Sequence, residues 1–322
     1  RALEMPTATF YAMAVNTVPA DDRILYADLT NRAARLTVHR GYALKGLVVD
    51  DKGEPIKEAR ILLGQSYYDR EKQQTQTDEK GQFEFKNLSS GSTMLTVQAN
   101  SKKPDVRPII IRANTPLQKI TPVKGHLIAG KVVDGAGQPL AEVAITMNQS
   151  VSPRTIRWQG KTKPDGTFRW GAAPMENMQF IFKKEDHVSH GRAIVPDKKP
   201  VTIVMPVAPL IEARVLDAAS GKAVKQFHFQ IGQVHNDGAD FFASSRDHTG
   251  TDGRLAVKLD EPEGVVLKVR ADGYLPVYSP TILAANPPRD LVIRLRQGGE
   301  IVGRVVLPDG QPAEGAYLAV LG

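Results

Sequence analysis

An internal repeat of about 85 residues constrains the fold of this chain more than any other feature. The stretch at 44–56 reads LKGLVVDDKGEPI, and similar stretches follow at 128–140 (IAGKVVDGAGQPL) and, shortened, at 301–313 (IVGRVVLPDGQPA). A weaker copy, IEARVLD, occupies 211–217. A later turn glycine keeps the same period, since Gly81, Gly166 and Gly253 lie 85 and 87 residues apart. Self-similarity at a fixed period indicates a tandem array of one structural unit.

The pattern inside each copy predicts β-strands. Apolar and polar residues alternate at 82–85 and at 167–170, the period of two expected for a strand with one buried face. The 27 glycines and 22 prolines fit short strands joined by tight turns, and no window of a dozen residues keeps helical spacing without one of them. The sequence therefore predicts an all-β protein, a tandem array of small Ig-like β-sandwiches arranged end to end.

The repeat also predicts where the domains begin and end. We expect residues 1–42 to be the C-terminal part of a preceding β-sandwich repeat. Three complete repeats follow at 43–124, 125–208 and 209–298, and residues 299–322 start a further, truncated repeat. Because only a few residues separate one repeat from the next, we expect a rather stiff rod. Both ends look cut from a longer protein, and no signal peptide is visible after Arg1.

Composition excludes several classes of function. With 41% hydrophobic and 24% charged residues the chain is globular, and no apolar run reaches the roughly 18 residues of a membrane span. The absence of cysteine excludes disulfides, thiolate metal sites and a cysteine nucleophile. The net charge of +7 comes from dispersed lysines and arginines, so we expect no nucleic-acid partner.

Several motifs together resemble a known family. They are the residues 46–55 and 77–85, their counterparts at 130–139 and 165–170, and the late Ala-Asp-Gly-Tyr at 271–274. This set resembles the carboxypeptidase regulatory-like domain, a transthyretin-like (prealbumin-like) β-sandwich. The chain departs from the pattern at Ala213, which replaces the opening glycine, and in its first two repeats, which lack the Gly-Tyr element. The resemblance implies a non-catalytic accessory module of secreted and cell-surface proteins.

Residues that could bind metal or perform catalysis do not form a recognised motif. Asp186, His187 and His190 are ligand types for zinc, but on a strand or loop their spacing does not place both imidazoles on one face. The acidic turns at 50–51, 77–79 and 165–166 lack the alternating aspartates of a calcium loop. No Gly-x-Ser-x-Gly elbow is present. We expect no catalytic residue, no metal site, no cofactor and no enzyme activity.

An internal Lys–Asn crosslink is a further alternative for a sandwich of this kind. Lys45 and Lys131 fall on the first strands of their repeats, but they occupy adjacent rather than equivalent positions. The asparagine required on the last strand is not evident. The sequence therefore does not favour a crosslink.

Aromatic residues recur in the loop between the second strand and the hairpin turn. Their faces could stack on sugar rings or on an apolar partner surface, or they could instead cover the open end of each sandwich. The first and third repeats place a pair at the same distance from the hairpin aspartate, and the second repeat has a tryptophan. The candidate binding residues are Tyr67, Tyr68, Trp158, Phe241 and Phe242.

Three functional hypotheses remain open on the sequence alone. The first is a non-enzymatic extracytoplasmic segment, periplasmic, cell-surface or secreted, that acts as a spacer or as a protein or glycan interaction region of a larger bacterial protein. The second is a carbohydrate-binding array that uses the loop aromatics. The third is the sensor or regulatory part of a membrane metallopeptidase whose catalytic domain lies outside this chain. The expected partners are other domains of the same polypeptide and a surface protein or polysaccharide, with no nucleic acid and no transmembrane segment.

Overall fold

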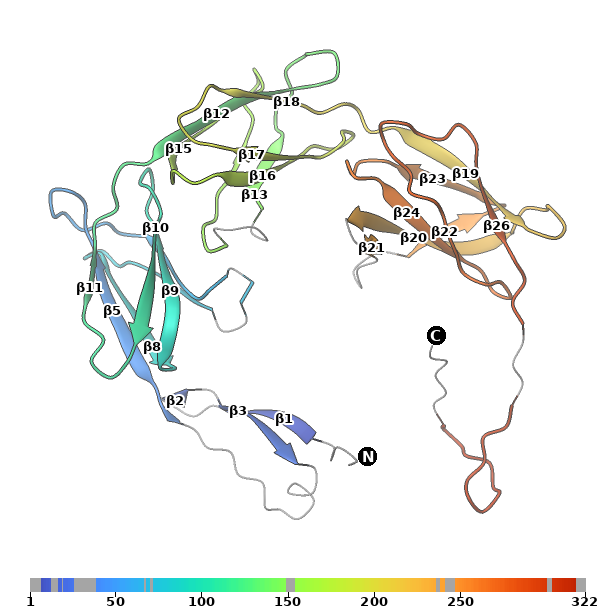
Figure 1. Ribbon diagram of the computed structural model, residues 1–322, viewed down its shortest axis with the longest axis horizontal. Coiled ribbons are helices and arrows are strands. Elements are labelled where there is room, and N and C mark those ends of the chain that lie inside the picture. Colours follow the sequence, from blue (N-terminus) through green and yellow to red (C-terminus); the bar gives the residue numbers. More distant parts are fainter. Residues whose placement is uncertain are drawn as a thin grey trace. The chain divides into compact units, whose positions relative to one another are not determined.

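The fold is made of β-strands throughout the described part of the chain (Figure 1). The computed structural model describes residues 7–12, 17–18, 20–25, 39–66, 68–69, 72–148, 154–235, 238–240, 247–299 and 303–316. The prediction of an all-β fold is confirmed. The chain divides into two compact units, with 1–185 and 189–206 in unit 1 and 186–188 and 207–322 in unit 2. Among the described segments, no helix is long and apolar enough to cross a bilayer.

The first sandwich, in unit 1, packs two sheets face to face. Its strands are β5 (Tyr42–Val48), β6 (Arg60–Leu63), β7 (Gln73–Gln76), β8 (Gln82–Leu88), β9 (Gly91–Gln98), β10 (Asp105–Ile111) and β11 (Gln118–Ile120). One sheet has the order β11-β5-β8 and the other β10-β9-β6-β7. The first strand β5 runs antiparallel to β8 and parallel to the last strand β11. Their inward side chains form one hydrophobic cluster, with Leu44, Ile61, Leu95 and Ile120 fully buried.

The second sandwich, also in unit 1, has the same strand order. Its strands are β12 (His126–Val133), β13 (Ala144–Met147), β14 (Gln159–Lys161), β15 (Thr167–Ala173), β16 (Met178–Lys183), β17 (His190–Ile194) and β18 (Val201–Val204). The sheets are β15-β12-β18 and β14-β13-β16-β17, and β12 is parallel to β18. The repeat seen in the sequence is thus a repeat of topology.

Unit 2 holds a third sandwich whose layers are joined. Its strands are β19 (Leu210–Asp217), β20 (Gln226–His235), β21 (Gly238–Asp240), β22 (His248–Thr251), β23 (Arg254–Lys258), β24 (Val265–Arg270), β25 (Val277–Tyr278) and β26 (Leu291–Leu295). They follow the path β25-β24-β20-β22-β23-β19-β26, with β21 beside β20. The path is continuous because β22 pairs with β23 through Thr251 and Arg254.

The flanking segments contribute short strands. β1 (Thr7–Ala12) pairs with β3 (Ala20–Leu25), and β2 (Thr17–Val18) pairs with β4 (His39–Arg40). Near the other end, a bridge between Val306 and Pro312 repeats the bridges Val49–Pro55 and Val133–Pro139. The turn of the repeated motif therefore has the same geometry in all three places.

The aspartate of the repeated motif organises this first turn. Oδ1 of Asp50 accepts hydrogen bonds from the backbone N–H groups of Lys52 and Glu54, both at 2.9 Å. Asp134 accepts the same two bonds in the second sandwich, at 2.9 and 2.8 Å. The backbone hydrogen bond from Glu54 is the largest cause that lowers the pKa of Asp50. Aspartate is well suited to this position because its side chain mimics a backbone turn.

The hairpin glycines are required by a close backbone approach. Gly81, Gly166 and Gly253 have positive φ values of 70°, 76° and 65°. A Cβ on Gly81 would lie 2.4 Å from the carbonyl oxygen of Val48, and the matching distances at the other two glycines are 2.5 and 2.7 Å. Any other residue would have to displace the first strand of its sandwich.

The glycine that opens the repeated motif is required by an aromatic ring. Gly46 pairs with Phe83 across β5 and β8, and a Cβ there would lie 2.2 Å from the ring. Gly130 has the same relation to Phe168, at 2.6 Å. In the third sandwich Ala213 pairs with a leucine, Leu255, in place of a phenylalanine. The departure of Ala213 from the sequence pattern therefore goes together with a smaller partner.

Candidate binding cleft

A loop of the second sandwich lies on the outer face of the first. On β9, Leu95 and Val97 point into the core, so Thr96 points outward. Thr96 is nevertheless only 1% exposed, because its Oγ1 donates a 2.7 Å hydrogen bond to Oγ1 of Thr155, which is also buried. Leu62, beside Thr96 in register, is 2% exposed although it lies outside the core cluster. The loop residues therefore shield this part of the sheet from solvent.

The side chain of Gln98 fixes the same loop close by, through the backbone of Arg157. Nε2 of Gln98 donates to the carbonyl oxygen of Arg157, and the backbone N–H of Arg157 donates to Oε1 of Gln98, both at 2.9 Å. One glutamine side chain thus satisfies both backbone groups of Arg157, as a neighbouring strand would. The contact joins the two sandwiches within unit 1.

A cleft of about 600 Å³ opens beside this contact. Its volume lies within the usual range for small-molecule sites, which is about 300–1,000 Å³. Its lining comes from both sandwiches of unit 1. It consists of Glu58, Arg60, Gln76, residues 98–102 and Pro104 of the first, and of Arg157, Trp158 and residues 169–172 of the second.

Positive charge dominates the cleft. Arg60, Arg157, Arg169 and Lys102 line it, against the single lining carboxylate of Glu58. Lys102 also lies 3.8 Å from a carboxylate oxygen of Asp51, outside the cleft lining. An anion that enters the cleft would therefore meet more cationic than anionic side chains.

Among the residues that the first sandwich contributes to the cleft lining, Arg60 lies between two others. In register it lies between Gln98 on β9 and Gln76 on β7, and both glutamines also line the cleft. Nη1 of Arg60 is buried and has no hydrogen-bond partner among the described residues. A buried donor without an acceptor costs about 1–3 kcal/mol, and more when it is charged. The arrangement is therefore suited to an added acceptor.

The two tryptophans of the chain both line the cleft. Trp158 is half-buried and stacks on Trp170, with ring centroids 5.3 Å apart and planes 21° apart. It also meets Phe180 edge to face at 5.7 Å. Trp158 thus packs against the second core while part of its ring faces the cleft.

The other candidate aromatics are placed differently. Tyr68 is 69% exposed and does not line the cleft. Tyr67, Phe241 and Phe242 lie outside the described residues. Of the five sequence candidates, the structure therefore brings only Trp158 to this cleft among those it describes.

Sequence reasoning did not single out Arg60, Arg157 or Arg169. For Arg60 a signal existed, since it is the charged residue that opens the short strand before the apolar Ile61 and Leu62. No local pattern marked Arg157, which belongs to the cleft because its loop crosses to the first sandwich.

The histidine and aspartate cluster near residue 186 has other contacts. Asp186 forms an ion pair with Lys258, and the hydrogen bond from Lys258 is the largest cause that lowers the pKa of Asp186. His190 meets the ring of Phe182, and burial lowers the pKa of His190. Within the described ranges, no group of three or more His, Cys, Asp or Glu side chains could hold a metal ion.

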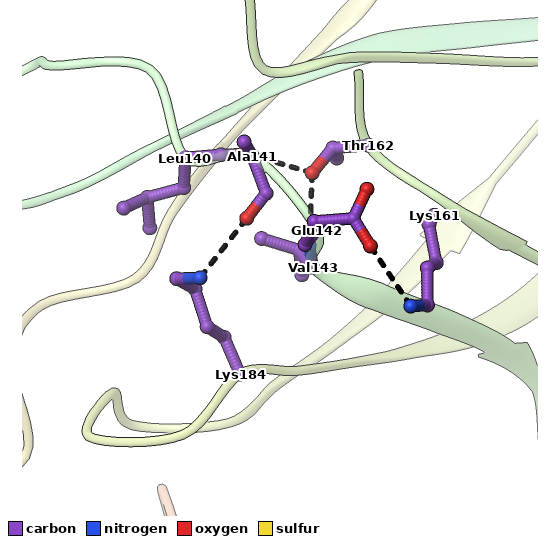
Figure 2. A network of polar contacts seen from close by, with 7 residues as sticks. All are labelled: Leu140, Ala141, Glu142, Val143, Lys161, Thr162 and Lys184. Carbon is purple, nitrogen blue, oxygen red and sulfur yellow. Dashed lines mark hydrogen bonds and ion pairs between the residues drawn. The ribbon is translucent and has the colours of Figure 1, made fainter. Parts of the chain in front are cut away.

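A polar network at the hairpin of the second sandwich is architectural (Figure 2). Thr162 is 1% exposed; its Oγ1 donates to the carbonyl oxygen of Leu140 at 2.6 Å and accepts from the N–H of Val143 at 2.9 Å. Around it, Lys161 pairs with Glu142 at 2.8 Å and Lys184 donates to the carbonyl oxygen of Ala141 at 3.0 Å. Thr77 makes the equivalent two bonds in the first sandwich. This hydroxyl ties the hairpin to the turn of the repeated motif.

The lysine considered for a crosslink lies on a solvent face. Nζ of Lys45 is 3.4 Å from Oε1 of Glu84, and both side chains are exposed. The last strand β11 reads Gln-Lys-Ile and holds no asparagine. The ion pair across β5 and β8 accounts for the position of Lys45.

Comparison with known proteins identifies the first sandwich. Residues 43–121 match the family model of the carboxypeptidase regulatory-like domain, which confirms for the first sandwich the resemblance seen in its motifs. No curated protein matches the chain.

Solved structures of pilins are similar at low identity. The streptococcal ancillary pilin is 13% identical over 80% of this chain and 100% of its own, with a TM-score of 0.34. BcpA, the major pilin subunit of Bacillus cereus, is 12% identical over 80% and 99%, with a TM-score of 0.23. SpaD, the major pilin of Corynebacterium diphtheriae, is 12% identical over 81% and 98%, with a TM-score of 0.25.

Proposed function

We propose that this chain, whose first sandwich is a carboxypeptidase regulatory-like domain, is a non-enzymatic extracytoplasmic segment of a larger bacterial protein. It spaces other domains of that protein and contacts a surface protein or a glycan. The observation that carries the proposal is the docking of the loop at 154–158 onto β9, because it fixes one repeat against the next within unit 1.

The direction of the first and last strands supports a spacing role. In each sandwich these strands are parallel neighbours, as at Gly46 and Gln118, Gly130 and Val201, and Ala213 and Leu291. The chain therefore begins a sandwich at one end of the ladder and leaves it at the opposite end. Each sandwich therefore adds its own length between the point where the chain enters it and the point where the chain leaves it.

The use of the acidic side chains supports a non-enzymatic role. Oδ1 of Asp78 accepts from the N–H groups of Lys80 and Gln82, and Oδ1 of Asp165 accepts from the N–H and the hydroxyl of Thr167. These carboxylates stabilise turns, as those of Asp50 and Asp134 do.

The proposal is tested with a distance measurement between the two sandwiches of unit 1. The chain has no cysteine, so Asn114→Cys and Lys199→Cys allow two spin labels to be placed at exposed positions. We expect a narrow distance distribution in the full chain. Thr155→Val combined with Gln98→Ala should broaden it, because the docking bonds are lost. A broad distribution in the unaltered chain would contradict a spacer role.

The carbohydrate-binding array remains the second candidate. The observation that favours it is the position of Trp158, which lines a cleft together with amide and cationic side chains. A sugar ring is bound by such a mixture of an apolar face and hydrogen-bonding groups.

A further inference from the structure

We propose that the cleft in unit 1 binds an acidic carbohydrate, a chain of uronic acids, and that Arg60 and Arg169 bind its carboxylates. The inference rests on the proposed interaction role and names the ligand class for it. It uses residues that the sequence motifs did not mark.

The charge of the lining selects an anion. The cleft presents Arg60, Arg157, Arg169 and Lys102 against Glu58 alone. Guanidinium groups match carboxylates in geometry, since their planar N–H donors meet both oxygens at once. Arg169 is exposed on β15 of the second sandwich, and Arg60 is partly buried on β6 of the first. The two side chains therefore approach a ligand from different sandwiches.

The unpartnered nitrogen of Arg60 is a second, independent observation. Its Nη1 is shielded from solvent and meets no acceptor among the described residues, while Gln98 beside it is already bonded to Arg157. A small movement of the Arg60 side chain toward the cleft would let a carboxylate there supply the acceptor that the described side chains leave out.

The remaining lining favours a sugar acid over an acidic peptide. Gln76, Asn100 and Ser101 offer amide and hydroxyl groups that both donate and accept, which matches the hydroxyls of a sugar. Trp158, with Trp170 stacked against it, supplies the apolar surface that the carbon face of a sugar ring requires.

A fluorescence titration of the full chain tests the inference directly, because both of its tryptophans line the cleft. The probe is a trimer of galacturonic acid, compared with the uncharged galactose trimer, with triglutamate and with inorganic phosphate. We expect saturable binding of the galacturonic acid trimer that weakens as salt is raised, and at least tenfold weaker binding of the other three. Triglutamate or phosphate that binds as tightly as the uronic acid would overturn the assignment, as would the absence of saturable binding.

Matched variants locate the site. Arg60→Gln and Arg169→Gln should each weaken binding about tenfold or more, whereas Arg112→Gln, an exposed arginine outside the cleft, should not change it. Arg169 is exposed, so we expect Arg169→Gln to fold normally. It therefore still tests the site if Arg60→Gln fails to fold. Unchanged binding in both cleft variants would overturn the proposal. The spin-label distance in the same samples separates this result from a failure of the spacer role, because a lost site leaves the distribution narrow.

Discussion

The first and third sandwiches build the same topology with their core phenylalanines in different layers. In the first, the ring of Phe83 packs over Gly46 in the sheet that contains the first strand. In the third that position pairs Ala213 with Leu255, and the ring is supplied instead by Phe227. Phe227 packs over Gly250 in the opposite half of the fold, where a Cβ would lie 2.1 Å from the ring.

The difference shows that the fold requires a certain total volume of core side chains rather than a particular residue at each position. In the first sandwich the strand register places Ala59 and Thr77 where the third has Phe227 and Gly250. The first sandwich packs a phenylalanine ring over a glycine in the layer of its first strand, and the third sandwich does so in the opposite layer. Cores tolerate such exchanges when the total volume is conserved.

The largest expected effect comes from Gly46→Ala. Its Cβ would meet the ring of Phe83 at 2.2 Å, so we expect a loss of about 3 kcal/mol in the stability of the first sandwich. Adding Phe83→Leu reproduces the pair of the third sandwich and should recover about half of that loss. Amide hydrogen exchange in β5 measures both. Gly171→Ala, where a Cβ meets nothing within 4 Å, is the control, and a double variant no more stable than Gly46→Ala would break the comparison.

The next effect comes from the hairpin threonine. Thr162→Val keeps the shape but leaves the N–H of Val143 and the carbonyl of Leu140 without their partner, so we expect about 2 kcal/mol of destabilisation. Tryptophan fluorescence during denaturant unfolding reports it, because both tryptophans belong to this sandwich. The exposed Thr202→Val should change stability by less than about 0.5 kcal/mol.

Dependence on a threonine hydroxyl should distinguish the first two sandwiches from the third. In the third, Gly250 occupies the threonine position. Backbone bonds tie that hairpin to the two residues that precede the second strand, from Asp252 N–H to the carbonyl of Lys225 and from Gly253 N–H to that of Val224. Replacing the neighbouring threonine, in Thr249→Val, should therefore have little effect. A large effect there would show that the third hairpin also depends on a threonine hydroxyl.

A smaller loss is expected from the reverse substitution in the third sandwich, Ala213→Gly. The substitution restores the motif glycine, but under Leu255 it removes a buried methyl group and adds backbone freedom. We expect a loss of about 1 kcal/mol in the third sandwich. Hydrogen exchange in β19 measures it. A gain in stability would show that glycine is favoured at this position whatever its partner is.

The smallest effect concerns pH and distinguishes the second sandwich from the first. Burial lowers the pKa of His190, so the folded state favours the neutral imidazole and the unfolded state binds the proton more readily. The contribution of neutral His190 to stability is therefore fully present above the unfolded-state pKa of about 6.5. It is lost as the pH drops toward the lower pKa of the folded state. Between pH 7.5 and 5 we expect a small loss of stability in the second sandwich.

The control for this titration is His190→Gln, which should remove that part of the pH dependence. In the first sandwich the equivalent position on β10 is Asp105, which forms a bidentate pair with Arg107 at 2.6 and 2.5 Å. An unchanged pH dependence in His190→Gln would assign the effect to another group.

The features that were predictable from the sequence depend on neighbouring residues. The turn at Asp50 requires an aspartate, a glycine and a proline within six positions, so its pattern is visible in the chain itself. The cleft depends on contacts between repeats, such as the one between Thr96 and Thr155, which are 59 positions apart. No periodicity records such a pair. For the same reason the loop position of Trp158 did not reveal that it stacks on Trp170.

The parallel pairing of first and last strands determines how each sandwich responds to tension. In the third sandwich the ladder between β19 and β26 runs from Ala213 and Leu291 to Asp217 and Leu295. Pulling the two ends of the sandwich apart slides these strands past each other, so the ladder hydrogen bonds are loaded in shear and share the force. A ladder loaded in this way breaks as a whole rather than bond by bond. A pulled repeat would therefore hold its length up to a threshold force and then yield in a single step.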